Sequence, residues 1–410
     1  MTVNSFKNKR PLIYIFLINI LISSFVFSYA INSISIILLF VFFFTDSKEN
    51  IKNKFKTLKN NKIVVFYVLF FLAQLLGMCY TQNTTTGWMK IQKFLPVFFL
   101  PLIAFSEKFS RKQFILNVEF LKVFFTLFFI MYLIFHVFVE NQPIGTFVFI
   151  VINNKLGMSQ FYLAVILLIP FLHCLNQIEH KENRGYNLIL SIFFFFCLII
   201  LKNKTTIFIL GLTLLFKAFL FLKNKFTVIK TIGIVSLLIG VFLSTIFFVP
   251  GLKKKFAILV KTTDFNIETI ITKNKVTHTK NTLEHRVLIN TIALKEIKKS
   301  FLFGVGTGDY LDLLYFNYKK IYFKQGIRER YNNHNQYFSE FLKTGVFGGV
   351  LFIVLIFLLL KSASNKDVFF VYLIMFFSIA CFFESYLERQ HGILIFSFIL
   401  PLFLKFDKKK

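Results

Sequence analysis

The sequence predicts an all-α fold: a polytopic membrane helical bundle of about 12 transmembrane helices, with one large outer loop that contains amphipathic helices. Three observations predict it. The 410-residue chain is 56% hydrophobic and has 62 phenylalanines, a composition too apolar for an ordinary globular protein, which excludes a soluble domain. Its apolar residues are gathered in runs of membrane-spanning length, and its basic residues lie between those runs.

Apolar runs of roughly 15 to 25 residues are long enough to cross the ~30 Å hydrocarbon core as helices. Such runs are expected before residue 250 at 12–30, 31–45, 63–80, 91–106, 114–139, 156–175, 188–201, 207–222 and 231–249. Further runs are expected at 341–360, 367–383 and 391–405. With no internal repeat and no linker, the predicted order is helices 1 to 9 in 1–249, the large loop in 250–340, and helices 10 to 12 with a tail in 341–410.

Lysine and arginine residues alternate between the connections of this bundle. They gather in 48–62, 108–112, 181–184, 223–230, 361–366 and 405–410. The alternate short connections, 81–87 and 140–154, contain neither residue type. Because cytoplasmic connections are enriched in basic residues, both termini are expected in the cytoplasm and 250–340 on the opposite side. The net charge of +29 is thus assigned to helix orientation, and no nucleic acid partner is expected.

Two helices are expected within the large loop, at 283–297 and 309–322, where apolar and polar residues follow helical spacing. Between them lie Gly304 and Gly306 in the sequence Gly-Val-Gly-Thr-Gly. This cluster fits neither the phosphate-binding loop nor the dinucleotide fingerprint, so a tight turn is predicted. The loop is expected to lie on the membrane and to form one wall of a cleft.

The sequence indicates no metal, no cofactor and no disulfide framework. The four cysteines all fall inside apolar runs without paired spacing. No cluster of His, Asp and Glu has metal-ligand spacing. Any phosphate chemistry in this chain is therefore expected to use Arg and Lys.

His334 and Arg286 are the leading candidates for chemistry in the loop. A neutral imidazole is well suited to accept a proton from a hydroxyl near neutral pH, and the alternative is an interfacial histidine that caps the next helix. Arg286 carries a planar fork that fits a diphosphate, and its alternative is a salt bridge with Glu284.

Several lysines lie on the outer side, where short connections otherwise lack positive charge. Lys202 and Lys204 share one very short connection, which suggests that they hold an anion. Lys90 and Lys93 lie at the outer entrance of the fourth run, where snorkelling to the interface is the alternative. The last outer connection contains Glu384, Glu388 and Arg389, for which pairing between loop and bundle is expected.

The order His334-Asn335, nine residues, then Gly345-x-x-Gly348 resembles the signature of the O-antigen ligase and O-antigen polymerase superfamily. The motif's position, at the end of the largest loop and before a transmembrane helix, is also similar. Arg286, followed by the turn at Gly304 and Gly306, resembles the family's loop arginine. Asn203-Lys204 occupies the place where many members have Ser-Arg, so the point charge of a lysine replaces the planar guanidinium fork of an arginine.

The resemblance implies a metal-independent glycosyltransferase of the bacterial inner membrane with a periplasmic loop and no cofactor. Such an enzyme transfers a glycan from undecaprenyl diphosphate to an acceptor hydroxyl. Arg286, Lys204, Lys202 and Lys93 would bind the diphosphate, and His334 would act with Arg286 in catalysis. Asn335, Gly345, Gly348, Gly304 and Gly306 would be structural motif residues.

The first functional hypothesis is O-antigen ligation to lipid A core, with membrane lipids as further partners. The alternatives are an O-antigen polymerase, an oligosaccharyltransferase acting on protein hydroxyls and, from a different class, a flippase or other transporter of lipid-linked glycans. Transporters usually contain repeats and charges near the bilayer midplane. Glu119 and Lys122 are the only close acid-base pair within a confident run, which favours an enzyme.

Overall fold

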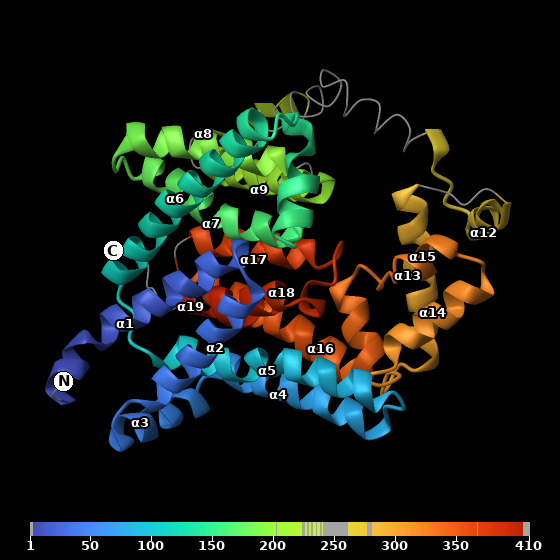
Figure 1. Ribbon diagram of the computed structural model, residues 1–410, viewed down its shortest axis with the longest axis horizontal. Helices are drawn as coiled ribbons and strands as arrows, with labels where there is room; N and C mark the ends of the chain where they lie inside the picture. Colours follow the sequence, from blue (N-terminus) through green and yellow to red (C-terminus); the bar gives the residue numbers. More distant parts are fainter. Residues whose placement is uncertain are drawn as a thin grey trace.

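A computed structural model describes residues 3–201, 203–223, 261–276, 281–366 and 368–404, with scattered positions between 226 and 240. The expected run 231–249 lies mostly outside these residues, as do loop residues 250–260. Throughout the described part the regular structure is helical and contains no strand, which confirms the predicted all-helical membrane architecture (Figure 1).

The helices before the loop are α1 (Val3–Ser23), α2 (Tyr29–Phe44), α3 (Lys48–Lys59), α4 (Lys62–Leu76), α5 (Thr84–Ser106), α6 (Arg111–Ile134), α7 (Gln160–Glu179), α8 (Arg184–Ile200) and α9 (Lys204–Lys223). The loop contains α12 (Ile267–Val276), α13 (Thr282–Lys299), α14 (Tyr310–Lys320) and α15 (Lys324–Arg328). After it follow α16 (Gln336–Ser364), α17 (Val368–Ala380), α18 (Gln390–Leu394) and α19 (Leu400–Phe403).

The predicted count of twelve spans is not confirmed. Among the described residues, 6 helices are long and apolar enough to cross a membrane, or up to 7 if the bent pair α2 and α3 is one span. One expected run, 231–249, lies mostly outside the described residues, and several others form shorter helices: α8 has 17 residues and α17 has 13. Two predicted loop helices, 283–297 and 309–322, are confirmed as α13 and α14.

Aromatic packing holds the centre of the bundle together. Phe70 of α4 contacts the rings of Phe94 of α5, Phe352 of α16 and Phe396 in the segment between α18 and α19. These rings come from distant parts of the sequence, so burying them fixes α4, α5 and α16 against the C-terminal segment. Many large apolar side chains on the outside of the bundle are exposed, as expected where a helix faces lipid.

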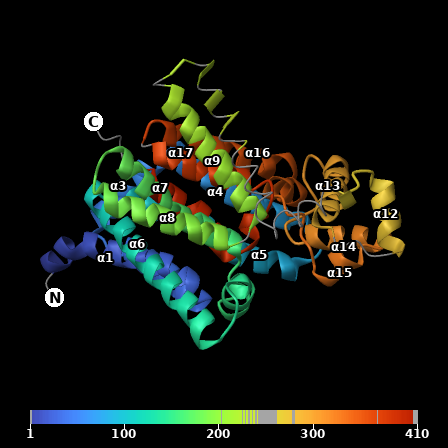
Figure 2. The same cartoon turned by 90° about the horizontal axis from the view of Figure 1, so that it is seen from above.

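The loop helices α12–α15 form a unit with a small core of its own, which includes Leu288, Ile289, Tyr310, Leu314 and Phe323. Figures 1 and 2 both place this unit at one end of the molecule, whereas α1 begins toward the other end. The first part of α16 and the connection between α17 and α18 lie where the loop unit meets the bundle. That junction contains the candidate site.

Candidate functional site

The backbone before α16 fixes the position of His334. Asn335 is the N-cap of α16, and its side chain accepts a hydrogen bond from the N–H of Phe338 at 3.2 Å. His334 has a φ of +46°, and its N–H donates to Oδ1 of Asn332 at 2.8 Å. Asn335, not His334, therefore caps the helix, and the imidazole ring is free of that structural task.

The imidazole of His334 contacts a carboxylate that is distant in sequence. Nδ1 lies 3.3 Å from Oε2 of Glu384, in the connection between α17 and α18. The histidine side chain is 25% exposed and that of Glu384 is 14% exposed, so the pair is reachable from solvent without being fully solvated. Within the described part of the chain, Nε2 has no hydrogen-bond partner. A carboxylate on Nδ1 orients the ring and leaves Nε2 available to accept a proton.

Arg286 reaches the same connection from α13. Its Nη1 donates to the carbonyl oxygen of Phe383 at 2.5 Å, whereas Nε and Nη2 have no partner among the described residues. Burial lowers the pKa of Arg286, and the nearby Glu384 carboxylate opposes that lowering. The alternative salt bridge with Glu284 does not form, because Glu284 pairs with Lys273 at 3.0 Å.

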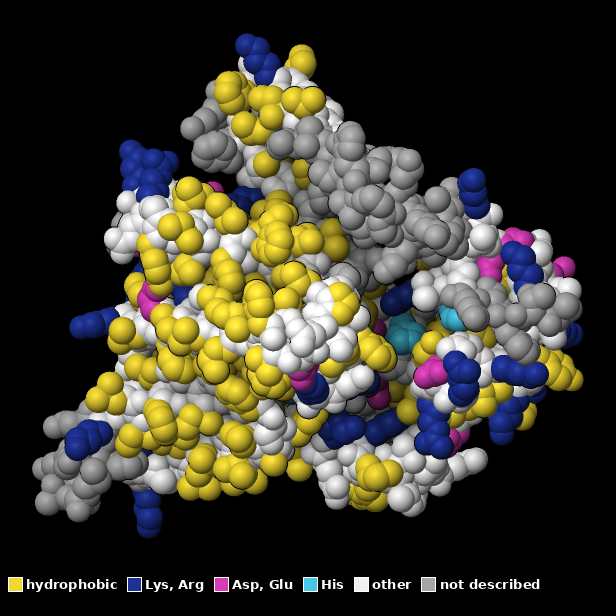
Figure 3. Space-filling model, turned by 45° about the horizontal axis from the view of Figure 1, so that its top comes forward, with side chains coloured by type: hydrophobic (Ala, Val, Ile, Leu, Met, Phe, Trp, Pro, Cys, Tyr) yellow, Lys and Arg dark blue, Asp and Glu magenta, His cyan; other side chains and the backbone are white. Residues whose placement is uncertain are grey.

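The structure thus brings two predicted residues, Arg286 and His334, onto neighbouring residues of one connection, Phe383 and Glu384. Figure 3 shows histidine and carboxylate side chains in a hollow between the apolar bundle and the unit formed by the loop helices α12–α15, with lysine and arginine side chains around it. A cation beside a histidine and carboxylate pair can hold an anionic leaving group while a hydroxyl loses its proton.

The motif glycines shape the junction rather than the chemistry. α16 is kinked at Thr344 and at Gly345, whose φ is +63° and ψ is −150°. The kink breaks the helical hydrogen bonds, and the turn between α13 and α14 replaces them. The N–H of Val305 donates to Leu342 O at 2.8 Å, and the N–H of Gly306 donates to Lys343 O at 3.0 Å. The N–H of Val346 donates in turn to Phe301 O at 2.8 Å.

Close approach explains the glycines in this contact. A Cβ on Gly304 would lie 2.6 Å from the backbone nitrogen of Gly345, and a Cβ on Gly348 would overlap the side chain of Thr344. The φ values of Gly304 and Gly306 are +73° and +109°. Gly304 and Gly306 are therefore favoured by their backbone conformation, and Gly304 and Gly348 are required because a side chain would not fit.

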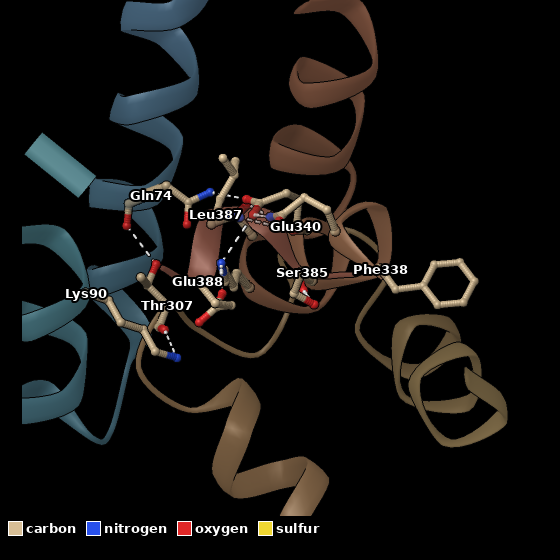
Figure 4. A network of polar contacts seen from close by, with 12 residues as sticks. Gln74, Lys90, Thr307, Phe338, Glu340, Ser385, Leu387 and Glu388 are labelled. Carbon is tan, nitrogen blue, oxygen red and sulfur yellow. Dashed lines mark hydrogen bonds and ion pairs between the residues drawn. The ribbon is translucent and has the colours of Figure 1, made fainter. Parts of the chain in front are cut away.

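A buried polar network joins α4, α16 and the connection between α17 and α18 (Figure 4). Glu340 accepts hydrogen bonds from Gln74 of α4 at 2.7 Å and from Gln336 at 2.5 Å. Lys343 is buried between Glu340 at 3.2 Å and Glu388 at 2.6 Å. Burial raises the pKa of Glu388, but Lys343 and other basic neighbours outweigh this effect and lower it to about 2. This ion pair joins the connection between α17 and α18 to α16.

Lys93 lies in a different place from Arg286 and His334. With Lys90 it lines a pocket of about 320 Å³ whose other walls include Thr307, Lys343 and Glu388. No hydrogen bond or ion pair joins Lys93 to Arg286 or His334 in the described residues. The side chains of Lys202 and Lys204 lie outside the described part, so their predicted role stays a prediction.

Among the residues that the structure describes, no group of three or more His, Cys, Asp and Glu side chains is placed so that it could hold a metal ion. Sequence reasoning assigned Glu384 to pairing between loop and bundle and missed its contact with the histidine. The available signal was an acidic residue in the connection that follows α17.

Comparison with protein families finds a match between residues 189–353 and the O-antigen ligase family. The matched segment contains Arg286, His334, Gly345 and Gly348 and ends before Glu384. Comparison with curated proteins finds no match. The family match confirms the resemblance to the O-antigen ligase and polymerase superfamily.

Proposed function

We propose, from this O-antigen ligase match together with the site geometry, that the protein transfers a glycan from undecaprenyl diphosphate to an acceptor hydroxyl on the periplasmic side of the inner membrane. Ligation of O-antigen to lipid A core is the first candidate. The observation that carries the proposal is the meeting of Arg286 and the His334–Glu384 pair at one connection. The family match supports glycan transfer in general, and this geometry supports the finer assignment.

In the proposed reaction, Nε2 of His334 accepts the proton of the acceptor hydroxyl as its oxygen attacks the anomeric carbon of the glycan. The bond between that carbon and the diphosphate oxygen breaks, and the diphosphate leaves with the electron pair. Glu384 on Nδ1 stabilises the protonated ring. Nε and Nη2 of Arg286 bind the diphosphate, whose negative charge increases as it leaves.

The diphosphate is already a competent leaving group, so the protein chiefly positions the acceptor and stabilises charge. Lys204 and Lys202 are proposed to add positive charge on the same side as Arg286. This chemistry calls for neither a cofactor nor a metal ion. A lipid-linked donor also gives a reason for placing the reaction beside a membrane bundle.

The lipopolysaccharide of a deletion strain tests the function. Loss of the whole O-antigen ladder, with accumulation of lipid-linked polymer, supports ligation. A single-repeat band indicates a polymerase instead. An unchanged ladder with loss of glycan from envelope proteins indicates a protein oligosaccharyltransferase, and accumulation of the lipid-linked glycan on the cytoplasmic side indicates a transporter.

Transfer by the purified protein is expected to continue in excess EDTA, because the proposed chemistry relies on Arg286 and lysines to hold the diphosphate. The measurement is the transfer rate from a lipid-linked donor before and after chelation. A matched sample with added Mg²⁺ serves as the control. Activity that disappears with EDTA and returns with Mg²⁺ would contradict metal-independent transfer.

Residue Lys273 on α12 is expected to be accessible from outside intact cells, and Lys410 is expected to be inaccessible, because lysine-rich connections mark the cytoplasmic side. Each is replaced by cysteine in a background without the four native cysteines and labelled with an impermeant thiol reagent. Labelling of the cysteine at position 410 without labelling at 273 would reverse the topology and remove the site from the periplasm.

A further inference from the structure

The backbone of His334 is held in place by neighbouring asparagine side chains. Its φ of +46° is a left-handed conformation that residues other than glycine rarely adopt, so it persists only where other contacts impose it. Oδ1 of Asn332 accepts a hydrogen bond from the N–H of His334 at 2.8 Å. Nδ2 of Asn333 donates to the carbonyl oxygen of Asn335, on the far side of the histidine, at 2.7 Å. Side-chain contacts therefore fix the histidine backbone from both sides.

Asn333 also contacts the connection that contains Glu384. Its Oδ1 accepts a hydrogen bond from Oγ of Ser339 at 2.7 Å and another from Oγ of Ser385 at 3.3 Å. The two serine oxygens lie 3.1 Å apart, so Asn333, Ser339 and Ser385 form a triangle of polar atoms, here named the Asn–Ser triangle. All three residues are buried, with exposed fractions of 1%, 0% and 1%. The triangle is therefore closed to substrate.

The Asn–Ser triangle joins the two segments that carry the proposed base and its carboxylate. Asn333 directly precedes His334, and Ser385 directly follows Glu384. The hydrogen bond between Asn333 and Ser385 thus connects two positions that are each one residue away from the 3.3 Å contact between Nδ1 and Oε2. A shift of either segment against the other would change that contact.

Gln336, the first residue of α16, holds the same connection on both sides of Ser385. Its backbone N–H donates to the carbonyl oxygen of Cys381 at 2.8 Å. Its Oε1 accepts a hydrogen bond from the N–H of Leu387 at 2.7 Å. The connection is therefore tied to the beginning of α16 at three places, and the Asn–Ser triangle is the one beside the histidine and its carboxylate.

Stability alone does not account for three buried polar side chains at this junction. A buried hydrogen bond adds little net free energy of folding, because both groups lose their contacts with water, and apolar residues of the same shape can be nearly as stable. Hydrogen bonds add direction, because they fix the distance and the angle between two groups. The Asn–Ser triangle thus fixes Ser385, and with it Glu384, relative to His334.

We propose that Asn333, Ser339 and Ser385 are positioning residues, which set the carboxylate of Glu384 against Nδ1 of His334 and so keep Nε2 without a proton. The inference rests on the proposed function, which assigns proton transfer to Nε2. A carboxylate can only accept a hydrogen bond, so its contact with Nδ1 keeps the ring proton on that nitrogen. Once the two segments are no longer tied, the proton distributes between both ring nitrogens, and less of the histidine is able to act as the base.

The first measurement is the tautomer of neutral His334, by nitrogen NMR of the full chain with isotope-labelled histidine in nanodiscs. The signal of this residue is identified by its absence in His334→Gln. In the wild type the proton is expected on Nδ1. Ser339→Ala and Ser385→Ala each remove one hydroxyl of the triangle, and a mixture of both tautomers is expected in each variant. This measurement needs no substrate, so it does not depend on the proposed function.

The second measurement is transfer kinetics of the same samples. Ser385→Ala is expected to lower kcat roughly tenfold or more, as misplacement of a catalytic group does, and to leave KM for the donor within about twofold. Glu384→Ala provides a second background, in which the positioned carboxylate is absent. There, Ser385→Ala is expected to lower kcat by no more than about twofold further, because coupled residues are not additive.

Ser397→Ala is the matched control. Ser397 is also fully buried, and its hydroxyl donates to the carbonyl oxygen of Ile393 at 2.7 Å. This variant therefore loses a buried hydroxyl and its hydrogen bond while the Asn–Ser triangle stays intact. Its His334 tautomer and its kcat are expected to equal those of the wild type. The unfolding temperature of Ser385→Ala is expected to match that of Ser397→Ala.

A wild-type tautomer in both Ser339→Ala and Ser385→Ala would overturn the proposal. Loss of kcat by the same factor with and without the Glu384 carboxylate would also overturn it, because that result indicates loss of folded enzyme rather than loss of positioning. Failure of the proposed function would appear instead as absence of transfer by the wild-type protein, while the change of tautomer would remain. The two failures are therefore distinguishable.

Discussion

Replacement of His334 with alanine is expected to lower the transfer rate by roughly 10²-fold or more, the usual contribution of a positioned general base. The change removes Nε2, the proposed proton acceptor, while the cap of α16 stays intact because Asn335 provides it. The folded fraction and the unfolding temperature are therefore expected to change little. The measurement is initial transfer rate, with thermal unfolding of the same detergent-solubilised sample.

His334→Gln separates proton transfer from positioning, since glutamine can hydrogen-bond without serving as a base. It is expected to be as inactive as the alanine variant. Glu384→Gln keeps the contact with Nδ1 and removes its charge, so we expect a smaller loss of transfer rate than in the alanine variant. His180→Gln, at an exposed residue after α7, is the matched control. Near-normal turnover of His334→Gln from pH 6 to 8 would refute the role of His334 as a general base.

Gly345→Ala is expected to produce the largest loss of folded protein among single methyl additions at the motif. The backbone there has φ +63° and ψ −150°, a region used almost only by glycine, where other residues cost roughly 1–3 kcal/mol. A Cβ would also lie 2.3 Å from the carbonyl oxygen of Leu302, which is backbone and cannot move alone. The turn between α13 and α14 would have to shift away from α16.

The measurement for Gly345→Ala is unfolding temperature and transfer rate, and both are expected to fall. Gly185→Ala provides the control, because Gly185 lies in the first turn of α8 with no heavy atom near its missing Cβ. It is expected to be neutral or slightly stabilising. An unfolding temperature for Gly345→Ala equal to that of Gly185→Ala would show that the kink is not required for folding.

Much of the helical architecture could be predicted because apolar runs and lysine positions are local features of the sequence. The lengths of the individual helices were harder to predict. The run at 367–383 contains enough apolar residues for a span, yet α17 ends at Ala380 because the chain then turns into the connection that contains Glu384. Composition does not reveal where a helix must stop to supply residues to a site.

The candidate site was partly predictable for a similar reason. Arg286 and His334 could be selected by residue type and motif spacing, but their common contact with residues 383–384 depends on three separate segments meeting. The ion pairs of Lys343 likewise join positions on α16 to Glu388. Lys90, considered beside Lys93 as a snorkelling residue, turns inward over Tyr310. No pattern along one segment specifies such contacts.

The kink in α16 turns the motif spacing into an angular constraint. Between the cap at Asn335 and the break at Thr344 lie about two turns of helix, with His334 before one end and the Gly304 turn bonded to the other. Since each helical residue adds about 100° of rotation, inserting one residue in this segment would swing the imidazole about a quarter-turn around the axis. A deletion would swing it the opposite way, out of register with Glu384. The number of residues between histidine and glycine thus sets the direction in which the imidazole points.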